Sequence, residues 1–142
     1  MLKGISPLIS PELLRILSEM GHGDEIVLAD AHFPGHGVGQ RVIRADGVPM
    51  VPLQEAILQL IPLDQYDRSN FVLMSVAEGD DVNPVIWKTY RRVLEKAEPE
   101  AEPSWLERFA YNERAKQACC VVVTGETAQY ANIILKKGVV CG

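Results

Sequence analysis

The residues best suited to acid–base chemistry gather in residues 21–34, which contain His22, Asp30 and His32. The run 26–29 is short and apolar, typical of a buried strand, and Asp30 follows where that strand should reach solvent. Ligands of open α/β sheets bind at such strand ends. Imidazole exchanges protons near neutral pH, so we predict that His22 and Asp30 form an acid–base pair. The alternative is structural, with His22 capping a helix and Asp30 starting a turn.

Two further polar segments lie beside predicted strands. Tyr130 and Asn132 precede the last strand, where a phenol and an amide can hydrogen-bond a polar ligand. The alternative makes Tyr130 a half-buried surface anchor. The acidic turn 78–81 suggests a cation site, but it lacks further ligands at the spacing of a calcium loop, which favours a solvated turn.

A metal centre is a rival hypothesis for the same residues. Asp30 and His32, together with His22 and His36, could ligate a metal ion and make the protein a small hydrolase. Residues 34–35, a proline and a glycine, prevent His32 and His36 from forming a pair one helical turn apart. This spacing disfavours the metal hypothesis without removing it.

A predicted helix delivers the chain to His22. Ser10 is suited to cap that helix, and Pro11 suits its first position, where a missing amide hydrogen costs nothing. Gly21 is the expected left-handed stop. We therefore expect His22 to enter the following loop in a fixed direction.

The rest of the chain alternates helical and strand patterns, which predicts one α/β domain, residues 1–142, with a layered α/β/α fold around a central, mostly parallel or mixed sheet. The glycine-rich segment 35–39 and the segment 97–103 are expected to be loops. The expected strands are 26–29, 41–45, 71–77, 106–110, 119–124 and 132–135, and the expected helices are 11–20, 52–61, 84–96 and 111–118.

Composition narrows the class of protein. Hydrophobic residues make up 47% of the 142 residues, and no apolar run approaches the ~20 residues that a membrane helix needs, so we expect no membrane partner. A net charge of -5 without clustered basic residues argues against nucleic-acid binding.

The three cysteines include the adjacent pair Cys119 and Cys120, and we expect free thiols in a reducing cytoplasm. Neither lies beside a basic residue that would activate it as a nucleophile.

Recognisable motifs run through nearly the whole chain. They are residues 5–14 (ISPLISPELL), 19–26 (EMGHGDEI), 30–34 (DAHFP), 42–47 (VIRADG), 108–115 (RFAYNERA), 124–126 (TGE) and 130–139 (YANIILKKGV). Together they resemble the motifs of the RbsD/FucU family of sugar mutarotases, and most of all those of its L-fucose mutarotase branch. The resemblance implies an RbsD-like fold and an isomerase that interconverts the α and β anomers of a reducing monosaccharide.

The resemblance also implies roles for individual residues. His22 matches the proton donor of the family, and Asp30, Arg108, Tyr130 and Asn132 match its sugar-binding positions. It implies that no metal and no organic cofactor is needed. It further implies a ring-shaped homo-oligomer, expected to be a decamer, with active sites at subunit contacts.

The identity of the sugar and of the general base stays open at this point. Ala131 departs from the glycine of many fucose mutarotases and matches the ribose pyranase branch, whereas His32 and Arg108 favour the fucose branch. Mutarotation needs a proton on the ring oxygen and another removed from the anomeric hydroxyl. A carboxylate or a phenol–water pair could accept the second proton. A ribose pyranase, a non-catalytic sugar-binding protein and the metal-dependent hydrolase are the alternatives.

Overall fold

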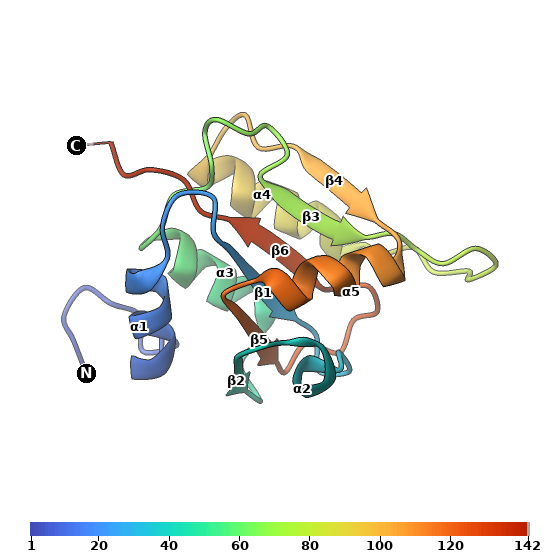
Figure 1. Ribbon diagram of the computed structural model, residues 1–142, viewed down its shortest axis with the longest axis horizontal. Helices are drawn as coiled ribbons and strands as arrows, with labels where there is room; N and C mark the ends of the chain where they lie inside the picture. The colour runs from blue at the N-terminus through green and yellow to red at the C-terminus, as the bar shows by residue number, and fades with distance from the viewer. Residues whose placement is uncertain (142) are drawn as a thin grey trace.

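In the computed structural model, which describes residues 1–141, five helices cover one sheet of six strands (Figure 1). The strands are β1 (Glu25–Ala29), β2 (Val42–Ala45), β3 (Phe71–Met74), β4 (Pro103–Leu106), β5 (Cys120–Thr124) and β6 (Ile133–Lys136), and the helices are α1 (Pro11–Glu19), α2 (Gly35–Val38), α3 (Met50–Leu58), α4 (Ile86–Ala97) and α5 (Arg108–Gln117). The strand order is β2-β5-β1-β6-β3-β4. β6 runs antiparallel to both neighbours, and the other adjacent pairs are parallel. The predicted layered α/β fold with a mostly parallel or mixed sheet is confirmed.

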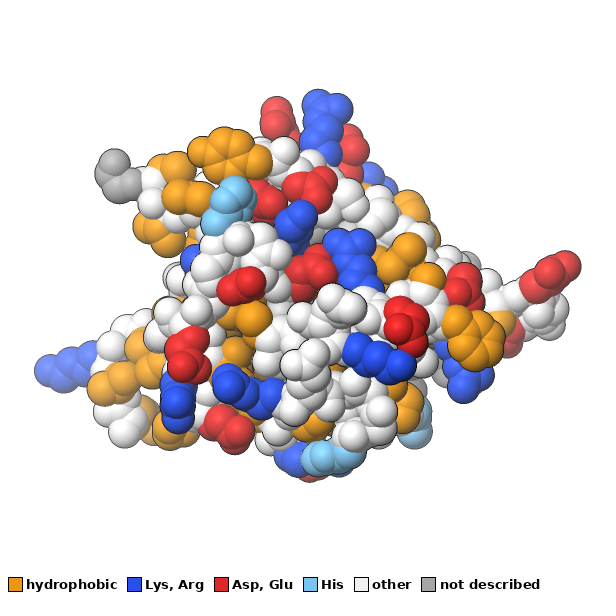
Figure 2. Space-filling model, in the orientation of Figure 1, with side chains coloured by type: hydrophobic (Ala, Val, Ile, Leu, Met, Phe, Trp, Pro, Cys, Tyr) orange, Lys and Arg blue, Asp and Glu red, His pale blue; other side chains and the backbone are white. Residues whose placement is uncertain are grey.

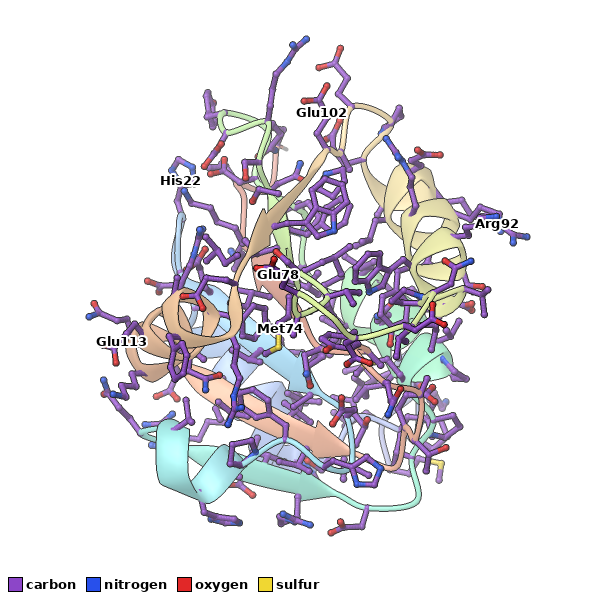
Figure 3. All side chains as sticks on the ribbon, turned by 90° about the vertical axis from the view of Figure 1, so that its right-hand side faces the viewer. His22, Met74, Glu78, Arg92, Glu102 and Glu113 are labelled. Atoms are coloured by element: carbon purple, nitrogen blue, oxygen red, sulfur yellow. The ribbon has the colours of Figure 1, made fainter. Side chains whose placement is uncertain are left out.

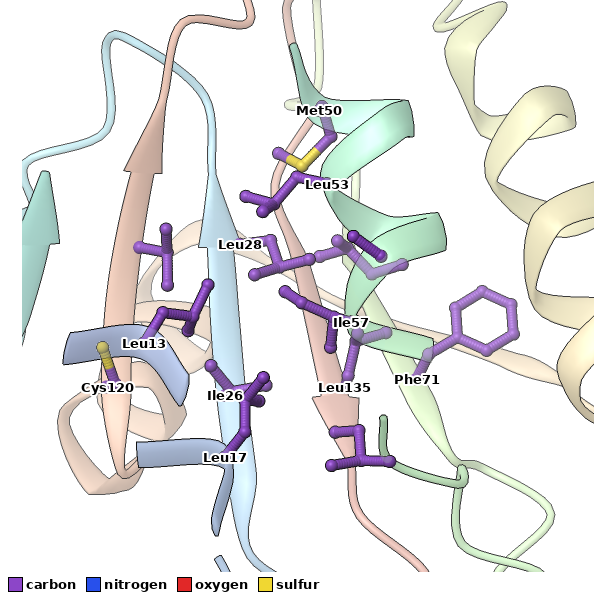
Figure 4. Close-up of a cluster of buried hydrophobic side chains, with 14 of the residues drawn as sticks. Leu13, Leu17, Ile26, Leu28, Met50, Leu53, Ile57, Phe71, Cys120 and Leu135 are labelled. Atoms are coloured by element: carbon purple, nitrogen blue, oxygen red, sulfur yellow. The ribbon is translucent and has the colours of Figure 1, made fainter. Parts of the chain in front are cut away.

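Helices cover both faces of the sheet. α1, α3 and α4 pack on one face, and α2 and α5 pack on the other (Figure 1). Within β1, Ile26 and Leu28 face the first layer, whereas Val27 and Ala29 face the second. β1 is apolar on both sides because both faces of the sheet are covered. Figure 4 shows the first cluster, to which α1 and α3 contribute Leu13, Leu17, Met50, Leu53 and Ile57.

Helix α1 begins as predicted and ends differently. The Ser10 hydroxyl accepts a hydrogen bond of 3.1 Å from the amide of Leu13, which makes Ser10 the N-cap. Gly21 was the predicted left-handed stop, and that prediction is wrong. The residue that follows α1 is extended, and the left-handed conformation occurs at Gly23, with φ of 86°. The sharp turn of the chain therefore comes after His22 rather than before it.

The segment that carries Arg108 also differs from the prediction, which gave a strand over 106–110 and a helix from 111. The strand ends at Leu106, and helix α5 begins at Arg108. The Glu107 carboxylate caps this helix by accepting hydrogen bonds from the amides of Phe109 (2.9 Å) and Ala110 (2.6 Å). Arg108 therefore lies in the first turn of a helix.

Most of the glycine-rich segment 35–39, predicted to be a loop, is the short helix α2, Gly35–Val38. It lies against β5 so closely that a Cβ atom on Gly35 would come within 2.7 Å of a methyl group of Val123. Only glycine allows this approach, so here the glycine serves packing. Helix α3 begins at Met50, two residues before the predicted start at Pro52.

The cysteines are free thiols, as expected, and the face drawn in Figure 2 shows no basic cluster. Cys119, Cys120 and Cys141 are free, and burial raises the pKa of Cys120 to about 12, which leaves it protonated at neutral pH. Acidic and basic side chains are interspersed on the face drawn in Figure 2. Of the helices in residues 1–141, none has the length and apolar character to cross a membrane.

Candidate functional site

A cavity of about 400 Å³ opens beside the carboxyl ends of β1 and β3. This volume lies in the range of small-molecule sites. Asp30 reaches it from the end of β1, Arg108 from the start of α5, and Tyr130 and Asn132 from the segment before β6. The fold thus brings together four of the five residues predicted for the site. The remaining lining residues are His32, Phe33, Pro34, Met74, Asp80, Asn112 and Gln129.

Asp30 and Asn132 are locked to each other at the base of the cavity. The backbone amide of Asp30 donates a hydrogen bond of 2.8 Å to Oδ1 of Asn132, and Oδ1 of Asp30 accepts one of 2.9 Å from the amide of His32. Because an amide donor fixes Oδ1 of Asn132 in place, its Nδ2 is the group left to donate to a ligand. Burial raises the pKa of Asp30 above its ordinary value, which prepares this carboxyl group for proton exchange.

Tyr130 is held by an unusual backbone and by a carboxylate. Its φ of 56° is left-handed, a conformation that costs a non-glycine residue roughly 1–3 kcal/mol. The Tyr130 hydroxyl donates a hydrogen bond of 2.5 Å to Oδ2 of Asp80 and accepts one of 3.2 Å from the amide of Ala77. The hydrogen bond to Asp80 is the main cause that raises the pKa of Tyr130. The indole of Trp87 donates a hydrogen bond of 2.7 Å to the Tyr130 carbonyl, which ties the turn to α4.

Arg108 stands beside an exposed aromatic ring. Its guanidinium carbon lies 5.7 Å from the ring centroid of Phe109, a cation–π distance. Phe109 itself is 72% exposed. The guanidinium presents several hydrogen-bond donors in a fixed fork, which suits the vicinal hydroxyl groups of a sugar.

His22 is the predicted site residue that the fold keeps away from this cavity. It precedes β1 whereas Asp30 follows β1, and five strand residues at ~3.3 Å each separate the two by roughly 17 Å. Figure 3 shows His22 away from Met74, which lines the cavity. The predicted pairing of His22 with Asp30 is therefore wrong within one chain. Nε2 of His22 instead lies 3.0 Å from Oδ1 of Asp64.

Sequence reasoning gave no role to Asp64, and it favoured a solvated turn for the segment that contains Asp80. Asp80 belongs to the acidic turn 78–81, whose carboxylate turns back to the Tyr130 hydroxyl. Asp64 follows α3 in a segment without a recognisable motif, so no local signal could have found it. Within residues 1–141, no group of three or more histidine, cysteine, aspartate or glutamate side chains is arranged to hold a metal ion.

Comparison with known proteins settles the family. Residues 3–140 match the RbsD / FucU transport protein family. The chain belongs to this family. Three solved structures resemble it over their full length.

The fucose mutarotase from Streptococcus pneumoniae, solved in complex with L-fucose, shares 50% identity with a TM-score of 0.92, and the match covers 99% of this chain and 100% of that one. FucU from Bifidobacterium longum shares 45% identity with a TM-score of 0.95, covering 98% and 100%. RbsD from Bacillus subtilis, complexed with D-ribose, shares 25% identity with a TM-score of 0.73, covering 99% and 100%. The resemblance inferred from the motifs is confirmed.

Proposed function

We propose that this chain is an L-fucose mutarotase, which interconverts the α and β anomers of the sugar. The observation that carries the proposal is the convergence of Asp30, Arg108, Tyr130 and Asn132 on one cavity. The Streptococcus pneumoniae fucose mutarotase, a sugar complex of the same fold, is 50% identical over 99% of this chain. The cavity thus offers a monosaccharide both donors and acceptors.

Four residues of the cavity have distinct roles in the proposed sugar binding. Nδ2 of Asn132 and the guanidinium of Arg108 donate hydrogen bonds to sugar hydroxyls, and the carboxyl group of Asp30 accepts one. Tyr130, fixed by Asp80, marks one wall of the cavity. This arrangement supports hydrogen bonding on several sides of a single pyranose ring.

The reaction opens and recloses that ring. A proton added to the ring oxygen and a proton taken from the anomeric hydroxyl give the open aldehyde, which rotates about its C1–C2 bond before it recloses. Two carboxyl groups line the cavity, those of Asp30 and Asp80. Asp80 is engaged by the Tyr130 hydroxyl, so Asp30 is the group that accepts the anomeric proton in this proposal. General acid–base catalysis of this kind contributes ~10²–10⁴-fold.

A second copy of the chain supplies the proton donor in this proposal. His22 lies too far from Asp30 to act in the same chain, so His22 of a neighbouring subunit faces the cavity at a subunit contact. The proposed assembly is a ring-shaped homodecamer, as the family resemblance implies. Free thiols at Cys119, Cys120 and Cys141 suit the reducing cytoplasm in which we place it.

Ribose is the second candidate substrate, because the related RbsD structure contains D-ribose. Ala131, which matches the ribose branch, supports that candidate only weakly. Its side chain is fully buried in the core cluster of the first layer, and its carbonyl accepts a hydrogen bond of 2.8 Å from the Tyr90 hydroxyl. The methyl group therefore packs in the core and does not line the cavity.

Anomer-exchange NMR tests the proposal. Exchange between α and β L-fucose, D-ribose and D-galactose is measured with and without protein, and L-fucose is expected to be accelerated most. Faster exchange for D-ribose alone would assign the protein to the pyranase class. Binding without faster exchange would make it a non-catalytic sugar-binding protein. Near-stoichiometric zinc or manganese in the purified protein would favour the hydrolase alternative.

A further inference from the structure

One polar side chain at the cavity has no hydrogen-bond partner in the chain. Oδ1 of Asn112 is buried, and within residues 1–141 no group donates a hydrogen bond to it. The other residues with unpaired buried side-chain atoms are Gln54, Asn70 and Tyr111, and none of these lines the cavity. Asn112 does line the cavity, so its amide is the unpaired group that lies beside a bound ligand.

Helix α5 presents Asn112 on the same face as Arg108. The two residues are four positions apart, which is about one helical turn, and both line the cavity. Tyr111 is fully buried in the second core cluster, and Arg114 forms an ion pair of 2.6 Å with Glu25 at the start of β1. These contacts fix the rotation of α5 against the sheet, so Asn112 keeps its place beside the cavity.

Other side-chain oxygens of the cavity are already engaged within the chain. Oδ1 of Asn132 accepts a hydrogen bond from the amide of Asp30, and Oδ1 of Asp30 accepts one from another backbone amide. Oδ2 of Asp80 accepts the hydroxyl hydrogen of Tyr130. Oδ1 of Asn112 is thus an acceptor without a competing donor, and each sugar hydroxyl brings a hydrogen that needs an acceptor.

Nothing in the described chain holds the Asn112 amide in one orientation. The torsion that turns the amide plane of asparagine has a broad energy minimum, so the plane can turn without moving the helix. Because Oδ1 has no partner where it is buried, turning it toward the cavity breaks no hydrogen bond. A hydroxyl group in the cavity then supplies the missing donor, and such pairing is the usual state of buried polar atoms.

We propose that Asn112 is a further substrate-binding residue, whose Oδ1 accepts a hydrogen bond from one hydroxyl group of the sugar ring. Arg108 donates hydrogen bonds from the neighbouring turn, so α5 meets the sugar with a donor and an acceptor side by side. A site built in this way rejects a deoxy sugar that lacks the matching hydroxyl, because the acceptor is again left unpaired. This inference rests on the proposed function, which supplies the sugar.

The test measures the Kd of L-fucose and of four analogues that each lack one hydroxyl group, at C1, C2, C3 or C4, by isothermal titration calorimetry. In Asn112→Leu, L-fucose should bind about 3–10-fold more weakly, the effect of losing one neutral hydrogen bond. Three of the analogues should lose the same factor. The fourth should bind equally well to variant and wild type, because the hydroxyl that Asn112 binds is already absent from it.

Two further variants keep the test decisive. Asn112→Asp keeps an acceptor oxygen and removes the NH₂ donor, so it should retain the L-fucose affinity that the leucine variant loses. Asn112→Ala carries the same expectation as leucine if the leucine variant does not fold. Gln117→Leu is the matched control, because it replaces an exposed amide of the same helix that does not line the cavity, and all five Kd values should stay unchanged.

Three results would overturn the role of Asn112. An equal loss for L-fucose and all four analogues in Asn112→Leu would make the residue structural, and an unchanged Kd for L-fucose would leave only water as its partner. Weak binding by Asn112→Asp would show that the amide does not act as an acceptor. If the wild type binds L-fucose without accelerating its exchange, the proposed function fails while the Kd values still decide the role of Asn112. If it binds none of the five sugars, both fail.

Discussion

His22 and Asp30 lie at opposite ends of strand β1, with all five residues of the strand between them. Both are expected to act on the same sugar, yet a strand of that length holds them roughly 17 Å apart. If both act on one sugar, as proposed, the cavity of one copy must lie against the His22 loop of another copy.

Complementation between two inactive variants tests this arrangement. His22→Ala and Tyr130→Phe should each slow anomer exchange by orders of magnitude, because the first removes the proposed proton donor and the second removes a hydroxyl group from the cavity wall. Both should assemble normally, because His22 is half exposed and phenylalanine keeps the ring that packs against the second core cluster. When they are co-expressed in equal amounts, a shared site regains both native residues with a probability of one half times one half. About a quarter of wild-type activity should therefore return. Background activity in verified mixed rings would show instead that each site is built within one chain.

Replacement of Arg108 by lysine should weaken the reaction although the charge is kept. The lysine ammonium cannot reproduce the guanidinium fork, and a lost charged hydrogen bond of ~1.5–3 kcal/mol corresponds to a fall of about 10–100-fold in kcat/KM for L-fucose. Arg92→Lys is the control, because Arg92 projects from α4 away from the cavity (Figure 3). An Arg108→Lys protein as active as wild type on every sugar tested would remove Arg108 from the binding site.

Asp30→Asn should abolish exchange without lowering stability at neutral pH. Burial raises the pKa of Asp30, so the folded state holds this proton more tightly than the unfolded state does. The stability that Asp30 contributes is complete below its unfolded pKa and is lost as pH rises through the raised folded pKa. The asparagine cannot ionise, and its Oδ1 can still accept the hydrogen bond from His32.

The Tm of Asp30→Asn minus the Tm of the wild type should therefore increase as pH rises from the unfolded pKa of Asp30 through its raised folded pKa. Asp46→Asn is the control of opposite sign, because Arg44 lowers the pKa of the exposed Asp46 carboxyl. Its Tm difference should become slightly negative as pH rises. A Tm difference for Asp30→Asn that falls with pH would contradict the assigned burial effect.

Removal of the Asp80 charge should weaken the hydrogen bond that holds the Tyr130 hydroxyl. Asp80 raises the pKa of Tyr130 through their hydrogen bond, so in Asp80→Asn the pKa of Tyr130 should move down toward its ordinary value. A spectrophotometric titration of the phenols, compared with Tyr130→Phe, measures this shift. We also expect KM for L-fucose to rise by about 3–10-fold, the loss of roughly one hydrogen bond. Asp81→Asn should change neither quantity, and equal effects from both variants would refute a specific role for Asp80.

Elements whose signals are local could be predicted from the amino-acid sequence. The apolar runs of β1 and β5 predict strands covered on both faces, because a strand buried on both sides has no polar alternation. Ser10 and Pro11 mark the start of α1 because capping depends only on the first turn. The motifs predict one sugar site that contains Asp30, Tyr130 and Asn132. Because these residues lie beside predicted strands, the sequence also predicts that they can contact a ligand.

Pairings between distant segments depend on how the chain packs in three dimensions. Strand patterns show which residues are buried, but they do not show that β6 enters between β1 and β3 in the antiparallel direction. Asp80 meets Tyr130 across 50 positions, and Asp64 meets His22 across 42. An acidic residue in a loop has the same local pattern whether it faces solvent or a partner, because the partner is chosen by the packing of the sheet and not by neighbouring residues in the chain.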